Sequence, residues 1–191
     1  QPELRAPQRV VDVGGGLGTF LLELLRRAPE AEAVLLDRPH VLERARPRFE
    51  AAGLSARVRF APGDFFDPLP VAGADLYVLK HVLHNWGDDD AVRILERCRA
   101  ALAAESRVWI IEGVLHPGTE RNLPRLMDLE MMMQFGRGRA REKRELRRLL
   151  ERAGLRLERP TRPLDRFARL LVARPARGAA QPLRGHLARV S

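Results

Sequence analysis

The sequence predicts an α/β fold: a doubly wound, Rossmann-like, mostly parallel sheet of about seven strands with helices on both faces. Short apolar runs alternate with helix-length amphipathic segments along the first half of the chain, a pattern typical of right-handed βαβ crossovers. A glycine-rich turn follows the first run, and open α/β sheets bind ligands at such turns. The run at residues 108–114 is almost continuously apolar, which indicates a central strand.

Each element is expected from its apolar period and from the residues that bound it. In the first half, strands are expected at residues 9–13, 33–37, 57–61, 75–79 and 108–114, and helices at residues 19–27, 41–52 and 90–102. In the second half, helices are expected at residues 123–135 and 142–153, and strands at residues 156–159 and 167–173. Gly154 is the expected C-cap of the last helix.

One catalytic domain is expected over residues 1–175, followed by a disordered tail at residues 176–191. The tail is rich in Arg, Ala, Gly and Pro and has few large apolar residues. The whole chain has 45% hydrophobic and 31% charged residues, as soluble globular proteins do. It contains no apolar run near the roughly 20 residues that span a bilayer, and its N-terminal residues show no signal-peptide pattern.

The single cysteine bears on the cellular location of the protein, and the basic charge bears on its binding partners. Cys98 excludes an internal disulfide, so a cytoplasmic protein is expected. The formal net charge is +9, but arginine is spread along the whole chain rather than gathered in a patch. The densest basic stretch, residues 137–148, also contains Glu142 and Glu145 and is interpreted as the solvated face of a helix. Neither a nucleic acid nor a membrane is therefore expected as a partner.

The glycine-rich turn has a spacing that favours S-adenosylmethionine over a nicotinamide dinucleotide. Gly14, Gly16 and Gly18 follow the pattern GxGxG, whereas Thr19 stands where a dinucleotide motif has its third glycine. Asp12 precedes the glycines by two residues. There a carboxylate would repel a pyrophosphate, but it suits the ammonium group of a methionine moiety.

Two further acids follow the second and third strands. Asp37 suits a bidentate contact to ribose hydroxyls, and Asp64 suits the adenine amino group while Phe65 packs on the ring. A turn or a helix cap would explain either acid alone equally well. Because acids stand at the ends of successive strands, the sequence predicts a nucleoside ligand.

Five motifs carry a resemblance to a known family. They are VVDVGGGLGTF, LLDRPHV, GDFFDPLP, LKHVLHNWGDDD and VWIIEGVL, in this order. Together they resemble the large O-methyltransferase family that includes caffeate and acetylserotonin methyltransferases and bacterial polyketide-tailoring enzymes. The likeness covers residues 10–175. It implies S-adenosylmethionine as co-substrate, no metal, and a small-molecule hydroxyl acceptor. The co-substrate residues that it implies are Gly14, Asp37, Asp64, Phe65 and Lys80.

The resemblance also implies a catalytic pair, His84 as general base and Glu112 as the carboxylate that orients it. A phenol with a pKa near 10 is a poor nucleophile at pH 7, and an imidazole with a pKa near 6.5 can take its proton. A carboxylate on the other ring nitrogen fixes the tautomer. His81 is the alternative base, but only His84 precedes Trp86 as in the family's His-Asp-Trp element.

The acceptor pocket is expected on the helix at residues 123–135, which lines that pocket in the family. Met127 and Met131 are flexible apolar side chains that suit a flat aromatic ring, and Asp128 lies beside them. Ordinary core packing would also explain these methionines. Trp86 suits either role.

Three departures from the family pattern bear on activity. Asn85 stands where the family has Asp, and Ala140 stands at the Glu position of the family's Gly-Gly-x-Glu-Arg-Thr motif, with Glu142 two residues away. The family's N-terminal winged-helix region has no counterpart, so a fragment or an open acceptor side is expected. A homodimer is expected if the full-length region is present.

Three functions other than O-methylation are alternatives for this sequence. The main alternative is an S-adenosylmethionine-binding domain that is catalytically weak or does not methylate. A methyltransferase acting on nucleic-acid bases is disfavoured, because residues 80–86 lack the Asn/Asp-Pro-Pro-aromatic element. A nicotinamide oxidoreductase is disfavoured by the glycine spacing.

Overall fold

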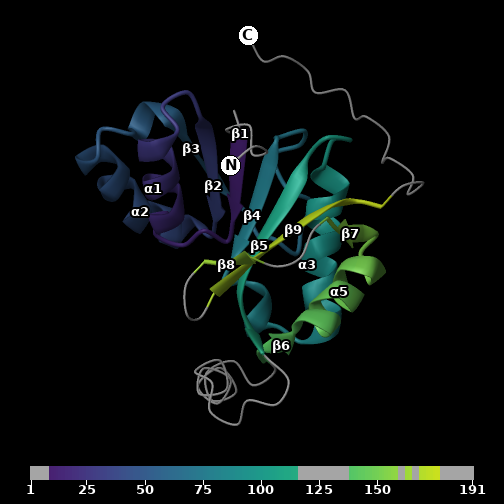
Figure 1. Cartoon of the computed structure of the whole chain (residues 1–191). Coiled ribbons are helices and arrows are strands. Elements are labelled where there is room, and N and C mark those ends of the chain that lie inside the picture. The colour runs from purple at the N-terminus through teal and green to yellow at the C-terminus, as the bar shows by residue number, and fades with distance from the viewer. Residues whose placement is uncertain (1–8, 116–137, 159–161, 165–167, 177–191) are drawn as a thin grey trace.

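The computed structural model describes residues 9–115, 138–158, 162–164 and 168–176. Its centre is one sheet of strand order β3-β2-β1-β4-β5-β9-β7 (Figure 1). The strands are β1 (Arg9–Val13), β2 (Glu32–Asp37), β3 (Val58–Pro62), β4 (Leu76–Lys80), β5 (Arg107–Leu115), β7 (Leu155–Leu157) and β9 (Ala168–Pro175). The helices are α1 (Thr19–Arg27), α2 (Pro39–Ala51), α3 (Asp88–Ala101) and α5 (Lys143–Arg152).

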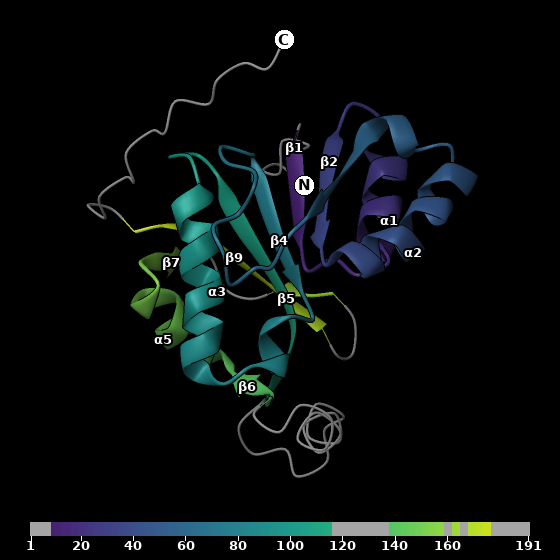
Figure 2. The ribbon, with the colours of Figure 1, turned by 180° about the vertical axis from the view of Figure 1, so that it is seen from behind.

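The sheet is parallel from β3 to β5, and β9 runs antiparallel to both β5 and β7. The helices cover both of its faces, with α1 and α2 on one face and α3 and α5 on the other (Figure 2). Alternate side chains of one strand enter the two cores. In β1, Val11 and Val13 belong to the core with α3 and α5, whereas Val10 belongs to the core with α1 and α2. The predicted doubly wound fold is confirmed.

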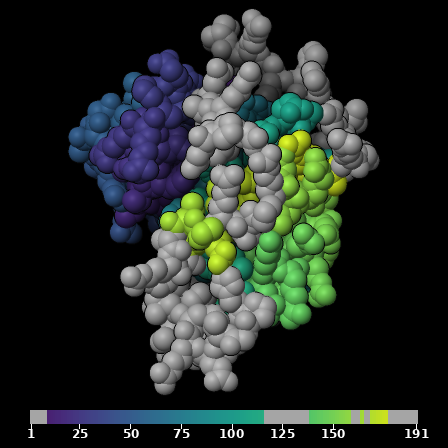
Figure 3. All heavy atoms as spheres, in the orientation of Figure 1, coloured from purple at the N-terminus to yellow at the C-terminus, as the bar shows by residue number. Residues whose placement is uncertain are grey.

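The molecule therefore has two helical sides joined by the sheet. Figure 3 shows the α1 and α2 side in purple and blue and α5 in green on the opposite side, with atoms of β8 and β9 between them. Within the described residues no helix has the length and apolar character needed to cross a bilayer, the longest being α3 with 14 residues.

The expected elements agree with the observed ones to within a few residues at their ends. The differences are short elements that carry little periodicity: β6 (Arg141–Glu142), which pairs with β5, β8 (Arg162–Pro163), which pairs with β9, and the 3-10 turns Ser55–Arg57 and Leu83–Asn85. The predicted helix at residues 123–135 lies outside the described residues, as does the predicted tail at residues 176–191 apart from its first residue.

The glycine-rich turn depends on left-handed backbone at several positions. Gly14, Gly16 and Gly18 have φ angles of 68°, 59° and 71°, a region that side chains with a Cβ rarely adopt. At Gly18 space is also limiting, because a Cβ there would lie 2.4 Å from the Phe49 ring of α2. Gly18 thus allows the start of α1 to approach α2 closely.

Candidate functional site

The predicted site residues gather at the carboxyl edge of the parallel strands. Asp37 is the last residue of β2 and Lys80 the last residue of β4. Asp12 lies one residue before the end of β1, paired in register with Leu35 and Val78. Strands β1 and β4 are neighbours, so the chain crosses from one side of β1 to the other here, and ligands bind at such a switch point.

Asp37 supports the glycine-rich turn directly. Its Oδ2 accepts a hydrogen bond from the Gly16 N–H at 2.8 Å, and its Oδ1 accepts one from the Arg38 N–H at 2.8 Å. Each carboxylate oxygen has a second lone pair, so Asp37 keeps acceptor capacity toward ligand hydroxyls. A Cβ on Gly16 would meet no atom of the described residues within 4 Å, so this part of the turn faces open space among them.

Asp12 is a buried carboxyl group with unused hydrogen-bonding capacity. It is 1% exposed, and neither of its carboxyl oxygens has a hydrogen-bond partner among the described residues. Burial raises the pKa of Asp12 to about 7, opposed by the positive charge of Lys80 and assisted by the negative charge of Asp37. A buried acid without a partner is costly, and a cationic ligand group would offset that cost.

The turn after β3 brings Asp64 and Phe65 toward the same edge. Asp64 Oδ1 accepts a hydrogen bond from the Phe66 N–H at 3.0 Å, and its Oδ2 lies 3.9 Å from Arg38. This is the turn role that was the alternative to adenine binding, so the adenine contact of Asp64 stays a prediction. The Phe65 ring lies against Gly14, where a Cβ would meet it at 3.2 Å.

An aromatic cluster connects this turn with the histidine segment. The ring centroids of Phe65 and Trp86 are 5.8 Å apart, and those of Phe66 and Trp86 are 4.7 Å apart, both edge to face. Trp86 therefore packs beside the predicted nucleoside residue Phe65. Its predicted contact with an acceptor is not tested by this packing.

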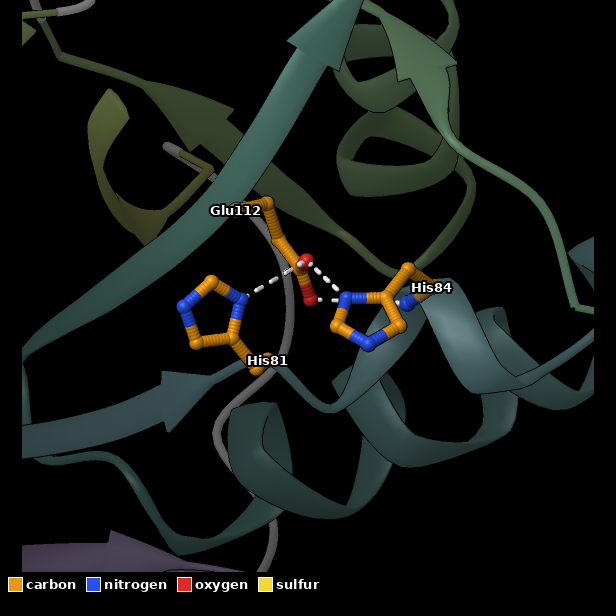
Figure 4. Close-up of side chains that lie close together, drawn as sticks. All are labelled: His81, His84 and Glu112. Carbon is orange, nitrogen blue, oxygen red and sulfur yellow. Dashed lines mark hydrogen bonds and ion pairs between the residues drawn. The ribbon is translucent and has the colours of Figure 1, made fainter. Parts of the chain in front are cut away.

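His84 and Glu112 are brought together although they are 28 positions apart in the chain. His84 Nδ1 lies 2.6 Å from Glu112 Oε2 (Figure 4). Glu112 Oε1 accepts a hydrogen bond from the Leu83 N–H at 2.8 Å. Glu112 is 2% exposed. Its carboxylate thus holds both the imidazole ring and the backbone of the 3-10 turn that carries it.

His81 is farther from the same carboxylate. Its Nδ1 lies 4.0 Å from Glu112 Oε2, and its side chain is 35% exposed, against 14% for His84. The Asn85 amide donates a hydrogen bond to the His81 carbonyl at 3.4 Å. Asn85 thus helps to hold the geometry of the turn without adding a charge to it.

Arg141 contributes to the site, contrary to the expectation from the sequence. It was expected on a solvated helix face, but it lies in β6 and is 2% exposed. Its guanidinium donates hydrogen bonds to the carbonyls of Leu83 at 2.8 Å and Trp86 at 2.6 Å, and to the Asp88 carboxylate at 2.9 Å. Arg141 therefore holds the carbonyl groups around the turn that carries His84, whereas Glu112 holds N–H groups of the same turn.

Comparison with known proteins decides the family. Residues 1–156 match the family model described as the O-methyltransferase domain.

The chain belongs to this O-methyltransferase family.

Among curated relatives, the chain is 40% identical over 149 residues to 3-amino-4-hydroxybenzoate 4-O-methyltransferase of Streptomyces cremeus, covering 78% of the chain and 40% of that protein. It is 43% identical over 154 residues to aclacinomycin 10-hydroxylase of Streptomyces purpurascens, covering 80% of the chain and 41% of that protein. The chain thus spans less than half the length of these relatives.

Solved structures of the family agree with the fold. An O-methyltransferase from neocarzinostatin biosynthesis, solved with S-adenosylmethionine and 2-hydroxy-5-methyl naphthoic acid, is 39% identical and has a TM-score of 0.81. That similarity covers 91% of this chain and 50% of the other.

The structure places most of the stretch at residues 137–142, which departs from the family's Gly-Gly-x-Glu-Arg-Thr motif. Ala140, at the family's Glu position, is buried, and Gly138 packs so closely that a Cβ would lie 2.6 Å from the His84 carbonyl oxygen. Glu142 does not take the missing role. Its carboxylate forms an ion pair with Arg144 at 2.7 Å, and its N–H donates to Glu145 at 2.8 Å at the start of α5. The arginine of the family's motif falls at Arg141, the signal that could have identified it.

Three predicted acceptor residues, Met127, Asp128 and Met131, lie outside the described residues. Their assignment to the acceptor pocket stays a prediction.

Proposed function

We propose that this chain is the catalytic domain of an S-adenosylmethionine-dependent O-methyltransferase in which His84 is the general base. The observation that carries the proposal is the 2.6 Å contact between His84 Nδ1 and Glu112 Oε2. Because Glu112 takes Nδ1, the tautomer with the proton on Nδ1 is favoured, which leaves Nε2 as the acceptor of a proton.

The reaction follows from this arrangement. His84 Nε2 takes the proton of an acceptor hydroxyl as its oxygen attacks the methyl carbon, and the bond from that carbon to sulfur breaks to leave S-adenosylhomocysteine. Glu112 stabilises the imidazolium that forms. The sulfonium already activates the methyl group, so the protein mainly aligns oxygen, carbon and sulfur. The expected absence of a catalytic metal follows from this chemistry.

The carboxyl edge fits the co-substrate. In this proposal the buried carboxyl of Asp12 receives the methionine ammonium group, and Gly14 and Gly16 let the backbone approach the methionine moiety. Asp37 accepts from the ribose hydroxyls. Asp64 and Phe65 surround the adenine, with Lys80 at the end of β4 beside the site.

The proposed acceptor is a hydroxyl of a small aromatic or polyketide-like molecule. Support comes from relatives, including 3-amino-4-hydroxybenzoate 4-O-methyltransferase and an enzyme solved with a hydroxynaphthoic acid. Trp86, with Met127, Asp128 and Met131, would line the pocket. A cytoplasmic location and a homodimer of the full-length protein belong to the same proposal.

A second candidate function is binding of S-adenosylmethionine without methyl transfer. Ala140 removes the second carboxylate that the family places near the histidine, and one similar protein is named a hydroxylase. In that case substitution of His84 would change nothing that the domain does.

Calorimetric titration with S-adenosylhomocysteine tests the co-substrate site first. We expect micromolar binding by the chain and at least tenfold weaker binding by Asp37→Ala, with Asp67→Ala as the control because Asp67 is exposed. A folded sample that does not bind would contradict the proposal for this chain.

Methyl transfer to a panel of phenols then separates the two functions. We expect His84→Ala to lower the turnover by about 10²- to 10⁴-fold while its affinity for S-adenosylhomocysteine stays within threefold of wild type. His40→Ala, on the exposed start of α2, is the matched control. Equal turnover in wild type and His84→Ala, or binding without any turnover, would favour the second function.

A further inference from the structure

We propose that His81, His84 and Glu112 form a binding site for a divalent transition-metal ion such as Zn²⁺, and that the bound ion inhibits the enzyme. One ligand atom of each of the three residues lies within 4.8 Å of the others. Figure 4 shows the Glu112 carboxylate between the two imidazole rings, with the Nδ1 atom of each ring facing it. Metal binding requires only these side chains, whereas inhibition rests on the function proposed above.

The distances are close to those of a tetrahedral site. A Zn²⁺ ion with ligands at about 2.0–2.1 Å has ligand atoms roughly 3.3 Å apart. Glu112 Oε2 lies 2.6 Å from His84 Nδ1 and 4.0 Å from His81 Nδ1. The two imidazole nitrogens lie within 4.8 Å of each other. An ion therefore fits if the first distance opens and the second closes by less than about 1 Å, and if the two nitrogens come to about 3.3 Å, which side-chain rotations supply.

The ligand chemistry selects the metal. Two imidazoles and one carboxylate suit Zn²⁺ and Cu²⁺, whereas Mg²⁺ and Ca²⁺ prefer oxygen ligands. Three protein ligands leave a fourth position for water or for an acceptor oxygen. Glu112 is already held through its other oxygen by the Leu83 N–H, so the carboxylate is oriented before an ion arrives.

The backbone of His81 holds its ring at this position. Among the described residues His81 is the one residue other than glycine with a positive φ, 55°. Its N–H donates to the Ile111 carbonyl at 3.0 Å, and its own carbonyl accepts from the Asn85 amide. Residues held in such a conformation gather at functional sites, and the proposed reaction gives His81 no role that would explain it.

The chemical consequence is loss of the base. A metal on His84 Nδ1 places the proton of the neutral imidazole on Nε2, so Nε2 no longer has a lone pair for the acceptor proton. The ion also takes the Glu112 oxygen that stabilises the imidazolium. Occupancy and methyl transfer are therefore mutually exclusive in this site.

Titration of the tag-free chain with Zn²⁺ by calorimetry, and with Co²⁺ by visible absorption, tests the binding. We expect one ion per chain with micromolar affinity, a tetrahedral Co²⁺ spectrum, and no response to Mg²⁺. His81→Asn keeps a residue that tolerates positive φ and should weaken binding at least tenfold. His40→Asn, an exposed histidine on α2, should leave the affinity unchanged.

Each outcome decides one of the two proposals. If wild type does not bind Zn²⁺, or binds it no better than His81→Asn, the metal site is overturned whatever the enzyme does. If Zn²⁺ binding depends on His81 but no phenol is methylated, the metal site stands and the proposed function fails. If both hold, methyl transfer should fall with Zn²⁺ occupancy and recover on chelation, and activity that persists in the Zn²⁺-loaded chain would overturn the inhibitory role.

Discussion

At the scale of single residues, Glu112 links the position of a side chain to the path of the backbone. Its buried carboxylate accepts from His84 Nδ1 at 2.6 Å and from the N–H groups of Leu83 and His84 at 2.8 and 3.4 Å. A buried charge is costly unless it is hydrogen-bonded, and these contacts meet that cost. The ring and the turn are therefore fixed by one group.

Substitution of Glu112 by glutamine should separate orientation from charge. Glu112→Gln keeps an oxygen for the turn but has no charge for the imidazolium and can hold the ring in the wrong tautomer. We expect kcat to fall by about 10²- to 10⁴-fold, with the affinity for S-adenosylhomocysteine within threefold of wild type. Glu23→Gln, on the surface of α1, is the control. A kcat within threefold of wild type would rule out the assigned role.

The raised pKa of Asp12 predicts that the stability of the protein depends on pH. The pKa of the folded protein's Asp12 is raised from 3.8 to about 7, so the folded state binds the proton more tightly than the unfolded chain. The free energy of unfolding must therefore decrease as the pH rises from about 4 to about 7.

Asp12→Asn removes this penalty. We expect the variant to be more stable than wild type by a few kcal/mol at pH 8 and to lose that advantage between about pH 7 and pH 4, at about 1.4 kcal/mol per pH unit. Urea denaturation across this range measures the effect. Exposed Asp67→Asn should show no such trend. The variant should also bind S-adenosylhomocysteine more weakly, and a pH-independent difference in stability would refute the argument.

At the scale of elements, the approach of α1 to α2 depends on Gly18. A Cβ at this position meets the Phe49 ring at 2.4 Å, whereas a Cβ at Gly53 meets no atom within 4 Å. Both glycines have a positive φ, 71° and 67°, so both alanine variants share the backbone cost of about 1–2 kcal/mol.

Comparison of Gly18→Ala with Gly53→Ala isolates the effect of the contact between a Cβ at residue 18 and the Phe49 ring. We expect Gly18→Ala to be less stable than Gly53→Ala by an additional 1–3 kcal/mol or so, because the core must shift to admit the methyl group. Chemical denaturation measures both. Equal losses would mean that Phe49 moves aside without cost.

Arg141 joins β6 to the 3-10 turn Leu83–Asn85 and to the start of α3. Arg141→Met would leave the carbonyls of Leu83 and Trp86 without their donor and Asp88 without this cation. We expect a loss of roughly 2–4 kcal/mol in the free energy of unfolding. Exposed Arg144→Met should change stability by less than about 1 kcal/mol. A loss below about 1 kcal/mol in Arg141→Met as well would contradict the stabilising role of these hydrogen bonds.

At the scale of the whole molecule, the full sequence carries a formal net charge of +9. Acidic partners lie beside arginines on several elements, as in the ion pairs Arg27–Glu23, Arg107–Glu158 and Arg152–Asp89. These ion pairs offset positive charge locally, so we expect the described part of the surface to provide little focused attraction for a polyanion.

Titration of a labelled DNA duplex by fluorescence anisotropy tests this distribution. At 0.15 M salt we expect no saturable binding below about 100 µM, the weak end of ordinary nonspecific affinities. Micromolar binding that weakens steeply with added salt would instead indicate a basic surface that the ion pairs do not neutralise.

The sequence by itself determined the fold and the edge at which the site lies. Apolar period and strand length define β1 to β5, and parallel strands all end at one edge, so Asp37 and Lys80 had to lie along the same edge of the sheet. The glycine-rich turn could also be predicted from the sequence, because Gly14 and Gly16 adopt a backbone conformation that other residues avoid. The short strand β6 was missed because two residues carry no period.

Only the tertiary structure decided which side chains meet. Register pairs Lys80 with Ile111, so Glu112 stands one residue beyond the end of β4, where the chain turns toward His84. Arg141 reaches Leu83 across 58 positions, and its burial was invisible in a stretch of like charges. Such contacts depend on the register of the sheet and on closing long loops, and neither is written in the local pattern of the chain.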